Sequence, residues 1–526
     1  MSDPKKHEAT GRSAFLVAAG ILISRIAGLV RVRVFSHYFG LASDAADAFN
    51  AAFRIPNFLQ NLFGEGVLSA SFIPVYANLL AREDDEESGR VAGAVFAILA
   101  LTASVLVAAG VLATPYLIDA IAPGFHGAKR ELTIRIVRIL FPGAGLLVLS
   151  AWCLGMLNSH RKFFLSYTAP VIWNLAMIAT LAVFGSRQPL DRLAVALAWG
   201  SVAGSALQFG VQVPTVLRLA RRLRISLDAA SANVRAVIRN FVPVFISRGV
   251  VQISAYVDAL LASLLPTGAV TGLTNAQLLY TLPVSLFGMS VSAAELPAMS
   301  SALGSDREVA DYLRRRLDSG LRQIAFFIVP ASAGFLVFGD TIAGALLQTG
   351  RFTHADSLYV WGILAGSTVG LLAMTLGRLY SSTYYALRDT RTPLRYAILR
   401  VALTTALGYL MAIPLPPAIG LNPRWGVAGL TASAGIAGWI EFTLLRRTLN
   451  RRIGRTGLPL GYVARLWTAA VVAAALAWGV RIAIGHRGPI LAAALILPSY
   501  GAAYFAMAMA LGLEEARAAL RRLRLH

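Results

Sequence analysis

Charged side chains stand inside apolar, membrane-length stretches near the start of this 526-residue chain. Arg25 and Arg31 fall in a stretch, 13–38, that we expect to form one long helix. At 1.5 Å per residue, Arg25 would lie about 15 Å along the helix from Phe15, at the middle of a hydrocarbon core about 30 Å thick. Charges at that depth are expensive in lipid, so they normally face a bundle interior or a wet cavity. The two arginines therefore predict a buried cationic site for an anionic ligand.

The next expected helix, 46–80, carries a polar stripe at helical spacing. The members of this stripe are Asp47, Asn50, Arg54, Asn61 and Glu65. We predict that Arg54 joins the cationic site, and that Asp47 and Glu65 act as gates that pair with arginines in one state and release them in another. The alternative is that ion pairs such as Asp47–Arg54 only hold helices together. Pro56 lies within the stripe and is expected to kink the helix.

The composition identifies an all-α, polytopic membrane protein. The chain is 57% hydrophobic and 14% charged, against about 25% charged residues in a soluble protein. Spans in lipid must satisfy their own backbone hydrogen bonds, and nothing here alternates like a barrel, so the spans are helices. The net charge of +22 gathers in alternate loops, which indicates membrane topology rather than nucleic-acid binding and predicts that both termini are cytoplasmic.

No motif for covalent chemistry accompanies these charges. The sequence lacks a phosphate-binding loop, a nucleophile elbow and an HExxH motif, so we expect a transporter without a cofactor rather than an enzyme. Its single cysteine, Cys153, precludes an intrachain disulfide, and its seven histidines show no ligand spacing.

We expect about fourteen transmembrane helices, arranged as two parallel six-helix repeats plus two C-terminal helices. Ser24-Arg25 and Ser247-Arg248 are separated by the same interval as Pro74 and Pro297, which indicates internal duplication. The segment between the repeats is basic and amphipathic; it would lie on the inner membrane surface, or alternatively form a solvated linker. The predicted divisions are 1–217 (six helices), 218–239 (linker), 240–446 (six helices) and 447–526 (two helices and a basic tail).

An ordered series of motifs resembles the MurJ (MviN) family of lipid II flippases, within a superfamily of multidrug and oligosaccharide-lipid exporters. The motifs are SRIAGLVR, FG, DAF, AFRIPN, FGEG and SASFIPV. The resemblance implies a central cationic cavity and a last helix pair that holds a lipid tail, although plain lipid-facing anchors would also suit that pair. It further implies a flippase that moves lipid II, an undecaprenyl-pyrophosphate-linked cell-wall precursor, across the bacterial cytoplasmic (inner) membrane by alternating access.

The resemblance also suggests the partners and the alternatives. Lipid II and membrane lipids are the expected partners, together with other cell-wall synthesis proteins; nucleic acid is not. One alternative is a flippase for another anionic lipid-linked glycan. The other is a transport-dead, MurJ-like membrane scaffold.

The chain departs from the family's pattern at two cavity arginines. Gln60 and Asn61 stand where the family carries one of them, and Leu278 stands where it carries another. We expect Arg248, placed in helix 7 as Arg25 is in helix 1, to supply the missing charge. The expected substrate-binding set is Arg25, Arg31, Arg54 and Arg248.

The family's sodium site, where present, uses acids in helices 7 and 11. Asp258 is a weak candidate for the first of these acids, but the expected helix 11, 394–413, contains none. We therefore predict no metal site, and we expect transport to depend on the membrane potential instead of on sodium.

Overall fold

The computed structural model of the protein describes residues 4–220, 222–227, 231–485 and 487–523. Side chains are described from Ala19 onward, apart from those of 65, 244, 246–255, 519, 520, 522 and 523. Two compact units make up the chain: the N-lobe, Met1–Ser263 with Thr349–Arg351, and the C-lobe, Leu264–Gln348 with Phe352–His526. The two lobes are described separately below.

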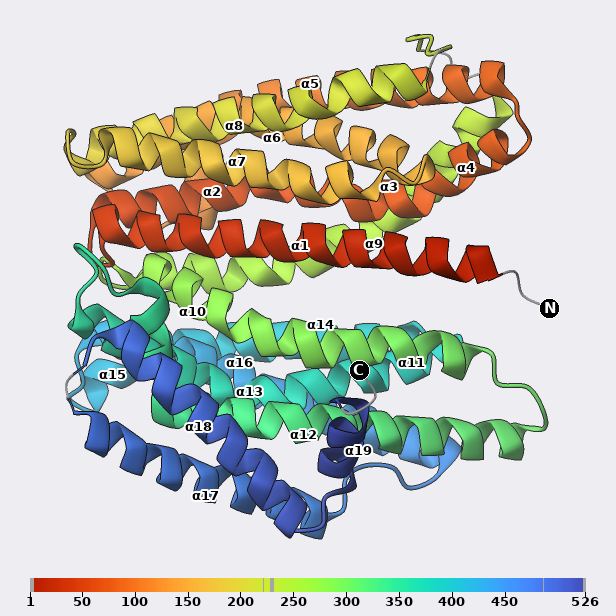
Figure 1. The fold of residues 1–526 in the computed structure, drawn as a ribbon. Helices are drawn as coiled ribbons and strands as arrows, with labels where there is room; N and C mark the ends of the chain where they lie inside the picture. Colours follow the sequence, from red (N-terminus) through yellow and green to blue (C-terminus); the bar gives the residue numbers. More distant parts are fainter. Residues whose placement is uncertain (1–3, 221, 228–230, 486, 524–526) are drawn as a thin grey trace. The chain divides into compact units, whose positions relative to one another are not determined.

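The N-lobe is a bundle of long helices (Figure 1). In chain order its helices are α1 (Pro4–Phe39), α2 (Asp44–Phe63), α3 (Glu65–Ser71), α4 (Ile73–Ala81), α5 (Asp85–Ile121), α6 (Gly127–Ser159), α7 (Phe163–Phe184), α8 (Leu190–Leu219) and α9 (Ala232–Ser263). Helix α6 packs against α2, α5 and α8, and α7 packs between α1 and α8. This arrangement brings α1, which carries the arginine described below, into one bundle with α2 and α7, which carry the residues in contact with it.

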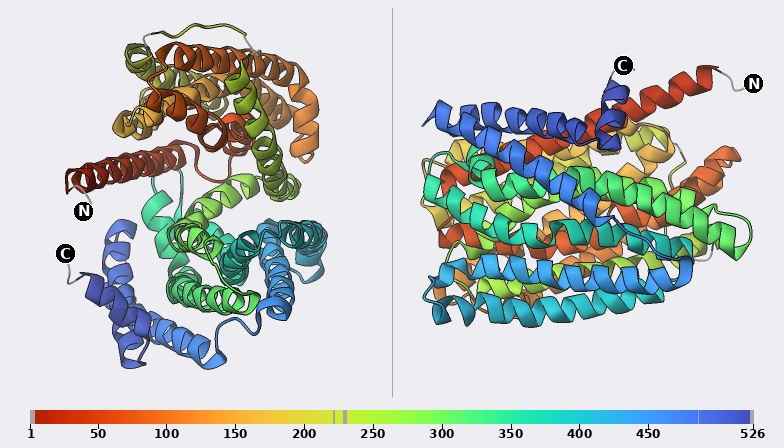
Figure 2. Two further views of the ribbon diagram at one scale, coloured as in Figure 1. Left: turned by 90° about the vertical axis from the view of Figure 1, so that its right-hand side faces the viewer. Right: turned by 90° about the horizontal axis from the view of Figure 1, so that it is seen from below.

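The C-lobe repeats this architecture and adds a terminal helix pair, and Figure 2 shows the helices nearly end-on. Its elements are α10 (Ala269–Pro283), the π-helix η1 (Val284–Met289), α11 (Ser290–Ser300), α12 (Asp306–Leu347), α13 (His354–Ala386), α14 (Arg391–Ala412), α15 (Leu415–Ala418), the 3-10 helix η2 (Pro423–Trp425), α16 (Gly426–Ile453), α17 (Leu460–Ile484), α18 (Pro489–Ala510) and α19 (Glu514–Leu523). Helix α13 packs against α12 and α16, and the α17–α18 pair packs on α12.

The predicted all-α membrane fold is confirmed. When each interrupted helix is counted as one segment, the described helices form seven long segments in each lobe, fourteen in all. Eleven described helices are long and apolar enough to cross a membrane by length and composition. Helix α2 is not among them, because its charged and polar residues lower its hydropathy.

The second segment of the N-lobe is broken at a glycine rather than at its proline. Pro56 lies inside a continuous α2, whereas Gly64 is extended (φ −78°, ψ −166°) and separates α2 from α3. A Cβ at position 64 would collide with the backbone carbonyl of Gln60, so the break needs glycine there. Pro56 causes no break, because a membrane helix can absorb a proline locally, and the kink expected there stays a prediction.

The second segment of the C-lobe is irregular at the matching place. The interval of 223 residues between Ser24-Arg25 and Ser247-Arg248 places Phe287 opposite Gly64, and Phe287 lies in η1. A π-helix adds a residue to a turn without breaking the helix, and here it follows directly after Pro283. Both repeats are thus irregular at one position, which supports the predicted duplication.

The boundary between the compact units differs from the predicted one. We placed it in the linker 218–239, but α9 belongs to the N-lobe, so the boundary follows Ser263. Helix α9 is held there by Phe241 and Phe245, whose rings lie 5.6 and 5.2 Å from that of Phe63. Its contacts are with α2, α3 and α5.

The predicted linker is not one amphipathic helix, because its described middle part is extended while residues 232–239 begin α9. After α8 ends at Leu219, residues 222–227 contain no helix and run along the start of α5. The Arg224 N–H donates to the Gly89 carbonyl at 3.4 Å, and the Arg224 guanidinium lies 3.4 Å from Glu86. A Cβ on Gly89 or Gly93 would collide with the linker backbone, so these glycines allow it to lie close.

A short strap from the α12–α13 loop belongs to the N-lobe. The Arg351 N–H donates to the carbonyl of His37 at 2.9 Å, and the His37 ring bonds the Thr349 hydroxyl at 2.9 Å. Gly350 adopts a positive φ of 54° and packs against His37. The end of α1 therefore holds residues 349–351 firmly.

Candidate functional site

The Arg31 guanidinium is held by neutral groups. Its Nε donates a hydrogen bond to Asn174 Oδ1 at 3.0 Å. Its Cζ lies 5.1 Å from the centre of the Trp173 ring and 5.8 Å from that of Phe53, which are cation–π contacts. We call these four residues the arginine box. Since none of its partners carries a charge, the positive charge of Arg31 stays available to an anion.

The neighbours of Arg31 are themselves fixed from α7 and α8. Asn174 Nδ2 donates to the Pro170 carbonyl at 3.0 Å, which directs the amide oxygen toward Arg31. Trp173 Nε1 donates to Ser201 Oγ at 3.2 Å, which holds the indole ring. The two terminal nitrogens of Arg31 have no hydrogen-bond partner among the residues that the structure describes. The arginine box is thus a preorganised cation with its terminal donors unused, as recognition of a phosphate requires.

Several arginines of the C-lobe are, by contrast, paired with carboxylates. Arg481 forms two hydrogen bonds to Asp340, at 3.1 and 2.6 Å, and joins α17 to α12. Arg400 Nε lies 3.0 Å from Glu441 Oε2 and joins α14 to α16. An arginine whose charge is already balanced inside the membrane acts as a structural tie. The cation of Arg31 lacks such a counterion, and this sets it apart.

Arg25 does not share the surroundings of Arg31. The structure leaves Arg25 exposed near the middle of α1, whereas Arg31 is partly buried against α2 and α7. Of the two arginines, only Arg31 belongs to the arginine box. A role for Arg25 in substrate binding stays a prediction.

Arg54 lies beside α9. Its backbone carbonyl accepts a hydrogen bond from the Tyr256 hydroxyl at 2.8 Å, and its guanidinium is close enough to Asp258 for the two charges to attract. Asp258, our weak sodium candidate, is thus a neighbour of an arginine. Among the described residues, no group of three or more histidine, cysteine, aspartate or glutamate side chains is placed to hold a metal ion.

Asp47 has an ionic partner that sequence reasoning missed. Its carboxylate is 1% exposed and lies 3.0 Å from Lys129 Nζ, at the start of α6. Lys129 also lies 3.1 Å from Asp44 and over the ring of Phe125. The available signal was that Lys129 opens a helix at the same end of the bundle as the start of α2. A gating role for Asp47 stays a prediction, and Lys129 joins it as a candidate.

Two other predicted residues, Arg248 and Glu65, have side chains outside the described residues. Their assigned roles in binding and gating stay predictions. Leu278 is half-buried in α10.

The positions of the missing family arginine line a cavity. Gln60 and Asn61 contribute to the wall of a cavity of about 520 Å³ inside the N-lobe bundle. No described side chain in its lining is charged. Where the family carries this arginine, this chain therefore has a polar cavity without a described charged side chain, and not a packed interior.

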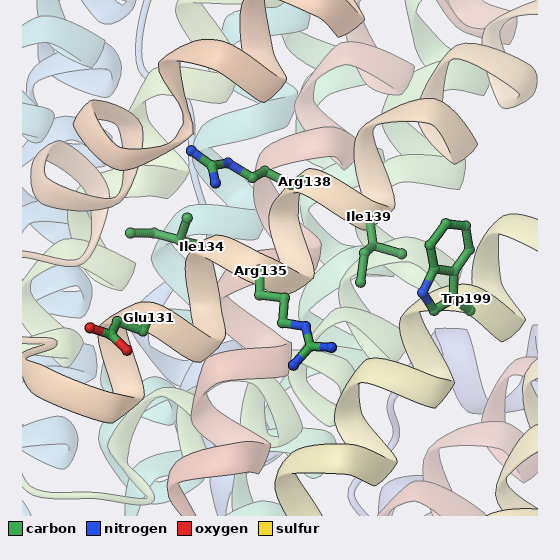
Figure 3. A pocket seen from close by; sticks show the side chains of 6 residues that line it. All are labelled: Glu131, Ile134, Arg135, Arg138, Ile139 and Trp199. Carbon is green, nitrogen blue, oxygen red and sulfur yellow. The ribbon is translucent and has the colours of Figure 1, made fainter.

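A further pocket, of about 480 Å³, lies between α6 and α8 (Figure 3). Figure 3 shows the Arg135 guanidinium directed toward Trp199, while Arg138 points away. Arg135, Arg138 and Trp199 are all exposed, and exposed arginine with tryptophan is typical of the membrane–water interface. None of the predicted site residues lines this pocket.

Comparison with known proteins decides the family. The family model for "Lipid II flippase MurJ" matches residues 35–498. The chain belongs to the MurJ family. It is 31% identical over 522 residues to the "Lipid II flippase MurJ" of Burkholderia cenocepacia, with 96% of this chain and 98% of the relative covered. It is 30% identical over 513 residues to the "Probable lipid II flippase MurJ" of Rhizobium meliloti, covering 94% and 93%.

Solved structures place the chain in the same fold. A MurJ structure titled "inward closed conformation" superposes with a TM-score of 0.76 at 22% identity, covering 94% of this chain and 98% of that one. An inward-facing MATE-family transporter of the MOP superfamily superposes with a TM-score of 0.66 at 17% identity, covering 83% and 98%. The motif-based resemblance to the MurJ family is confirmed, and the likeness to the MATE-family transporter shows a shared fold.

Proposed function

We propose that this protein is a lipid II flippase, a transporter that moves the undecaprenyl-pyrophosphate-linked precursor from the inner to the outer leaflet of the bacterial cytoplasmic membrane by alternating access. Membership of the MurJ family supports this function. The observation that carries the mechanism is the arginine box, a cation within an apolar bundle whose partners are all neutral. Such a group binds a pyrophosphate by charge-assisted, bidentate hydrogen bonds.

The other predicted residues complete this proposal. Arg25, Arg54 and Arg248 would join Arg31 in binding pyrophosphate or carboxylate groups. Asp47 and Glu65 would act as gates, with Lys129 as the partner that Asp47 releases. No bond is made or broken, so binding, reorientation and release are the whole reaction. The same proposal places both termini in the cytoplasm, because the basic loops 81–90, 303–318 and 446–455 would then face inward.

Replacement of a depleted lipid II flippase in living cells tests the function. We expect the wild-type chain to restore growth, and Arg31→Ala, made at equal levels, to fail. Purified protein in liposomes should then flip lipid II. Flipping of a different pyrophosphate-linked glycan, with no lipid II activity, would favour the alternative substrate. Absence of any flipping would favour the scaffold.

The driving force follows from charge. Because the cytoplasm is negative, outward movement of an anionic headgroup is favoured by about 2.3 kcal/mol per charge for each 100 mV. Collapse of the potential with valinomycin and potassium should therefore slow flipping, whereas replacement of sodium by choline should not. A sodium requirement without voltage dependence would contradict this proposal.

A further inference from the structure

The cavity of about 520 Å³ in the N-lobe is lined mainly by uncharged polar groups. We call it the N-lobe polar cavity. Its polar side chains come from α2, α3, α6 and α8, and they are Gln60, Asn61, Ser69, Ser150 and Gln208. Between them lie the apolar surfaces of Leu147, Leu154 and Pro170. Its size falls within the range of about 300–1,000 Å³ that is typical of small-molecule sites.

The hydrogen bonds among three buried polar side chains at this cavity leave carbonyl oxygens available as acceptors. Gln208 and Gln212 both donate to Ser150 Oγ at 3.0 Å, and all three side chains are at least nine-tenths buried. Their shared contact with Ser150 fixes both amides, so that both glutamine carbonyl oxygens remain as acceptors. Gln212 Oε1 is buried without a hydrogen-bond partner among the described residues. Gln212 lies behind the cavity wall, whereas its bonded neighbour Ser150 and Gln208 line it. Buried polar groups normally find partners, so this cluster keeps hydrogen-bonding capacity beside the cavity.

Two partly exposed side chains in the cavity wall also have amide groups without a hydrogen-bond partner among the described residues. Gln60 and Asn61 are partly exposed and make no hydrogen bond with any residue that the structure describes. An amide presents both a donor and an acceptor. The described side chains of the lining therefore offer both kinds of group and carry no fixed charge.

The arginine box and this cavity adjoin each other. A small cavity of about 20 Å³ has Phe53 and Trp173 of the arginine box in its wall, and also Gln60 and Leu147 of the N-lobe polar cavity. Phe53 and Gln60 are seven residues apart on α2, about 10 Å along the helix axis. A cation thus stands at one end of this path and a neutral polar cavity at the other.

We propose that the N-lobe polar cavity binds the neutral sugar part of the lipid-linked substrate, while Arg31 binds its pyrophosphate. This proposal rests on the proposed flippase function. Hydroxyl and acetamide groups of a sugar match the amides and hydroxyls of the wall, and its C–H faces match the leucines and the proline. A phosphate would find no counter-charge there, and a hydrocarbon tail would leave the polar groups unpaired.

Binding of two ligands to the purified full-length chain tests the proposal. The ligands are lipid II and undecaprenyl pyrophosphate, which has the same lipid and pyrophosphate but no sugar. Gln60→Leu and Gln208→Leu keep the side-chain size and remove its hydrogen bonds. We expect each to weaken lipid II binding about tenfold and to leave undecaprenyl pyrophosphate binding unchanged, because a sugar group would be buried unpaired. Arg31→Gln should weaken the binding of both ligands.

Gln188→Leu, in the turn between α7 and α8 and outside the cavity lining, is the matched control and should bind both ligands as the wild type does. Thermal melting of every variant reports folding. Variants that fold normally and lose both ligands equally, or lose neither, would overturn the sugar assignment. If the wild type binds lipid II no better than it binds undecaprenyl pyrophosphate, the sugar assignment is also overturned. Failure of the wild type to bind or flip lipid II at all would instead overturn the flippase function itself.

Discussion

In both lobes the second membrane segment departs from a regular α-helix at the equivalent position of the repeat. The surroundings of that position differ between the lobes. In the N-lobe the helix breaks at Gly64, and the residues around it line the N-lobe polar cavity. In the C-lobe the chain stays helical through η1, where Phe287 stacks on Phe327 with ring centres 4.3 Å apart. Gly288 packs against the Thr375 side chain. In the N-lobe, this part of the duplicated segment lines a cavity. In the C-lobe, it packs against neighbouring side chains.

The partners of the arginine side chains described above also differ between the two lobes. Arg31 in the N-lobe has only neutral partners, whereas Arg481 and Arg400 in the C-lobe are balanced by Asp340 and Glu441. An unbalanced cation is available to a ligand, while a balanced one ties helices together.

Arg31→Ala should have the largest effect on transport. Loss of the cation should cost at least about 2 kcal/mol of anion binding, which is more than tenfold in affinity. Folding should change little, because no carboxylate is left unpaired. Flipping in liposomes and thermal melting measure the two effects, with exposed Arg187→Ala as the matched control. Normal flipping by a well-folded Arg31→Ala protein would remove the functional contrast between the lobes.

Arg481→Ala should show the opposite behaviour. It leaves Asp340, which is largely buried, without its partner, and breaking a buried ion pair destabilises a protein by about 3–5 kcal/mol. Because Arg481 is partly exposed, solvent should reduce this to about 2 kcal/mol. Thermal unfolding of the purified protein measures the loss, and the double variant Arg481→Ala/Asp340→Asn should recover much of it. An unchanged melting temperature would contradict the structural role.

Asp47 and Lys129 test whether the N-lobe also contains a purely structural pair. A double-mutant cycle with Asp47→Asn and Lys129→Gln should give a coupling free energy above the roughly 1 kcal/mol of an exposed pair, because Asp47 is buried. Coupling in transport rates, with little in melting, would identify a gate. Coupling in melting alone would make the pair an N-lobe equivalent of Arg481–Asp340.

Gly64→Ala should be more harmful than Gly288→Ala. The new Cβ at position 64 meets the backbone carbonyl of Gln60, which cannot move independently of α2. At position 288 it meets the terminal methyl of Thr375, which can rotate away. We expect a loss of about 1–3 kcal/mol at position 64 and less at 288, measured as unfolding free energies. Equal losses would mean that the two irregularities are equally constrained.

The smallest expected effect is a pH dependence confined to the N-lobe. The hydroxyl of Tyr76 on α4 bonds His160 Nε2 at 3.0 Å, while α11 in the C-lobe is held by the non-titrating contact of Thr383 with Met299. Burial, helped by Lys162, lowers the pKa of His160 despite Asp85.

Below about pH 6.5 the unfolded histidine binds a proton that the native one resists, so stability should fall as the pH drops from 7 to 5. Because His160 is partly exposed to solvent, we expect less than about 1 kcal/mol. Unfolding curves at several pH values should show this slope, and His160→Gln should abolish it. A slope that persists in His160→Gln would assign the effect to another group.

The sequence was sufficient to predict the helical fold and one member of the site, for physical reasons. Apolar length predicts spans directly, and a charge placed deep in one of them, such as Arg31, has few stable environments. Its partners were not predictable, because Asn174 lies 143 residues away and meets Arg31 only through packing of α1 on α7. The break at Gly64 was missed because proline is the stronger breaker in isolation, while the collision that demands glycine exists only in the folded chain.

The strap at Thr349–Arg351 makes the N-lobe discontinuous along the chain. The chain passes between the two units after Ser263, before Thr349 and after Arg351. Thr349 and Arg351 are bonded to His37 near the end of α1, and Ser263 Oγ accepts from the Gly124 N–H in the α5–α6 loop. All of these crossings therefore lie at the end of the N-lobe where α1, α5 and α9 finish. That end of the N-lobe therefore holds both the segment where the chain leaves it and the segment that returns to it.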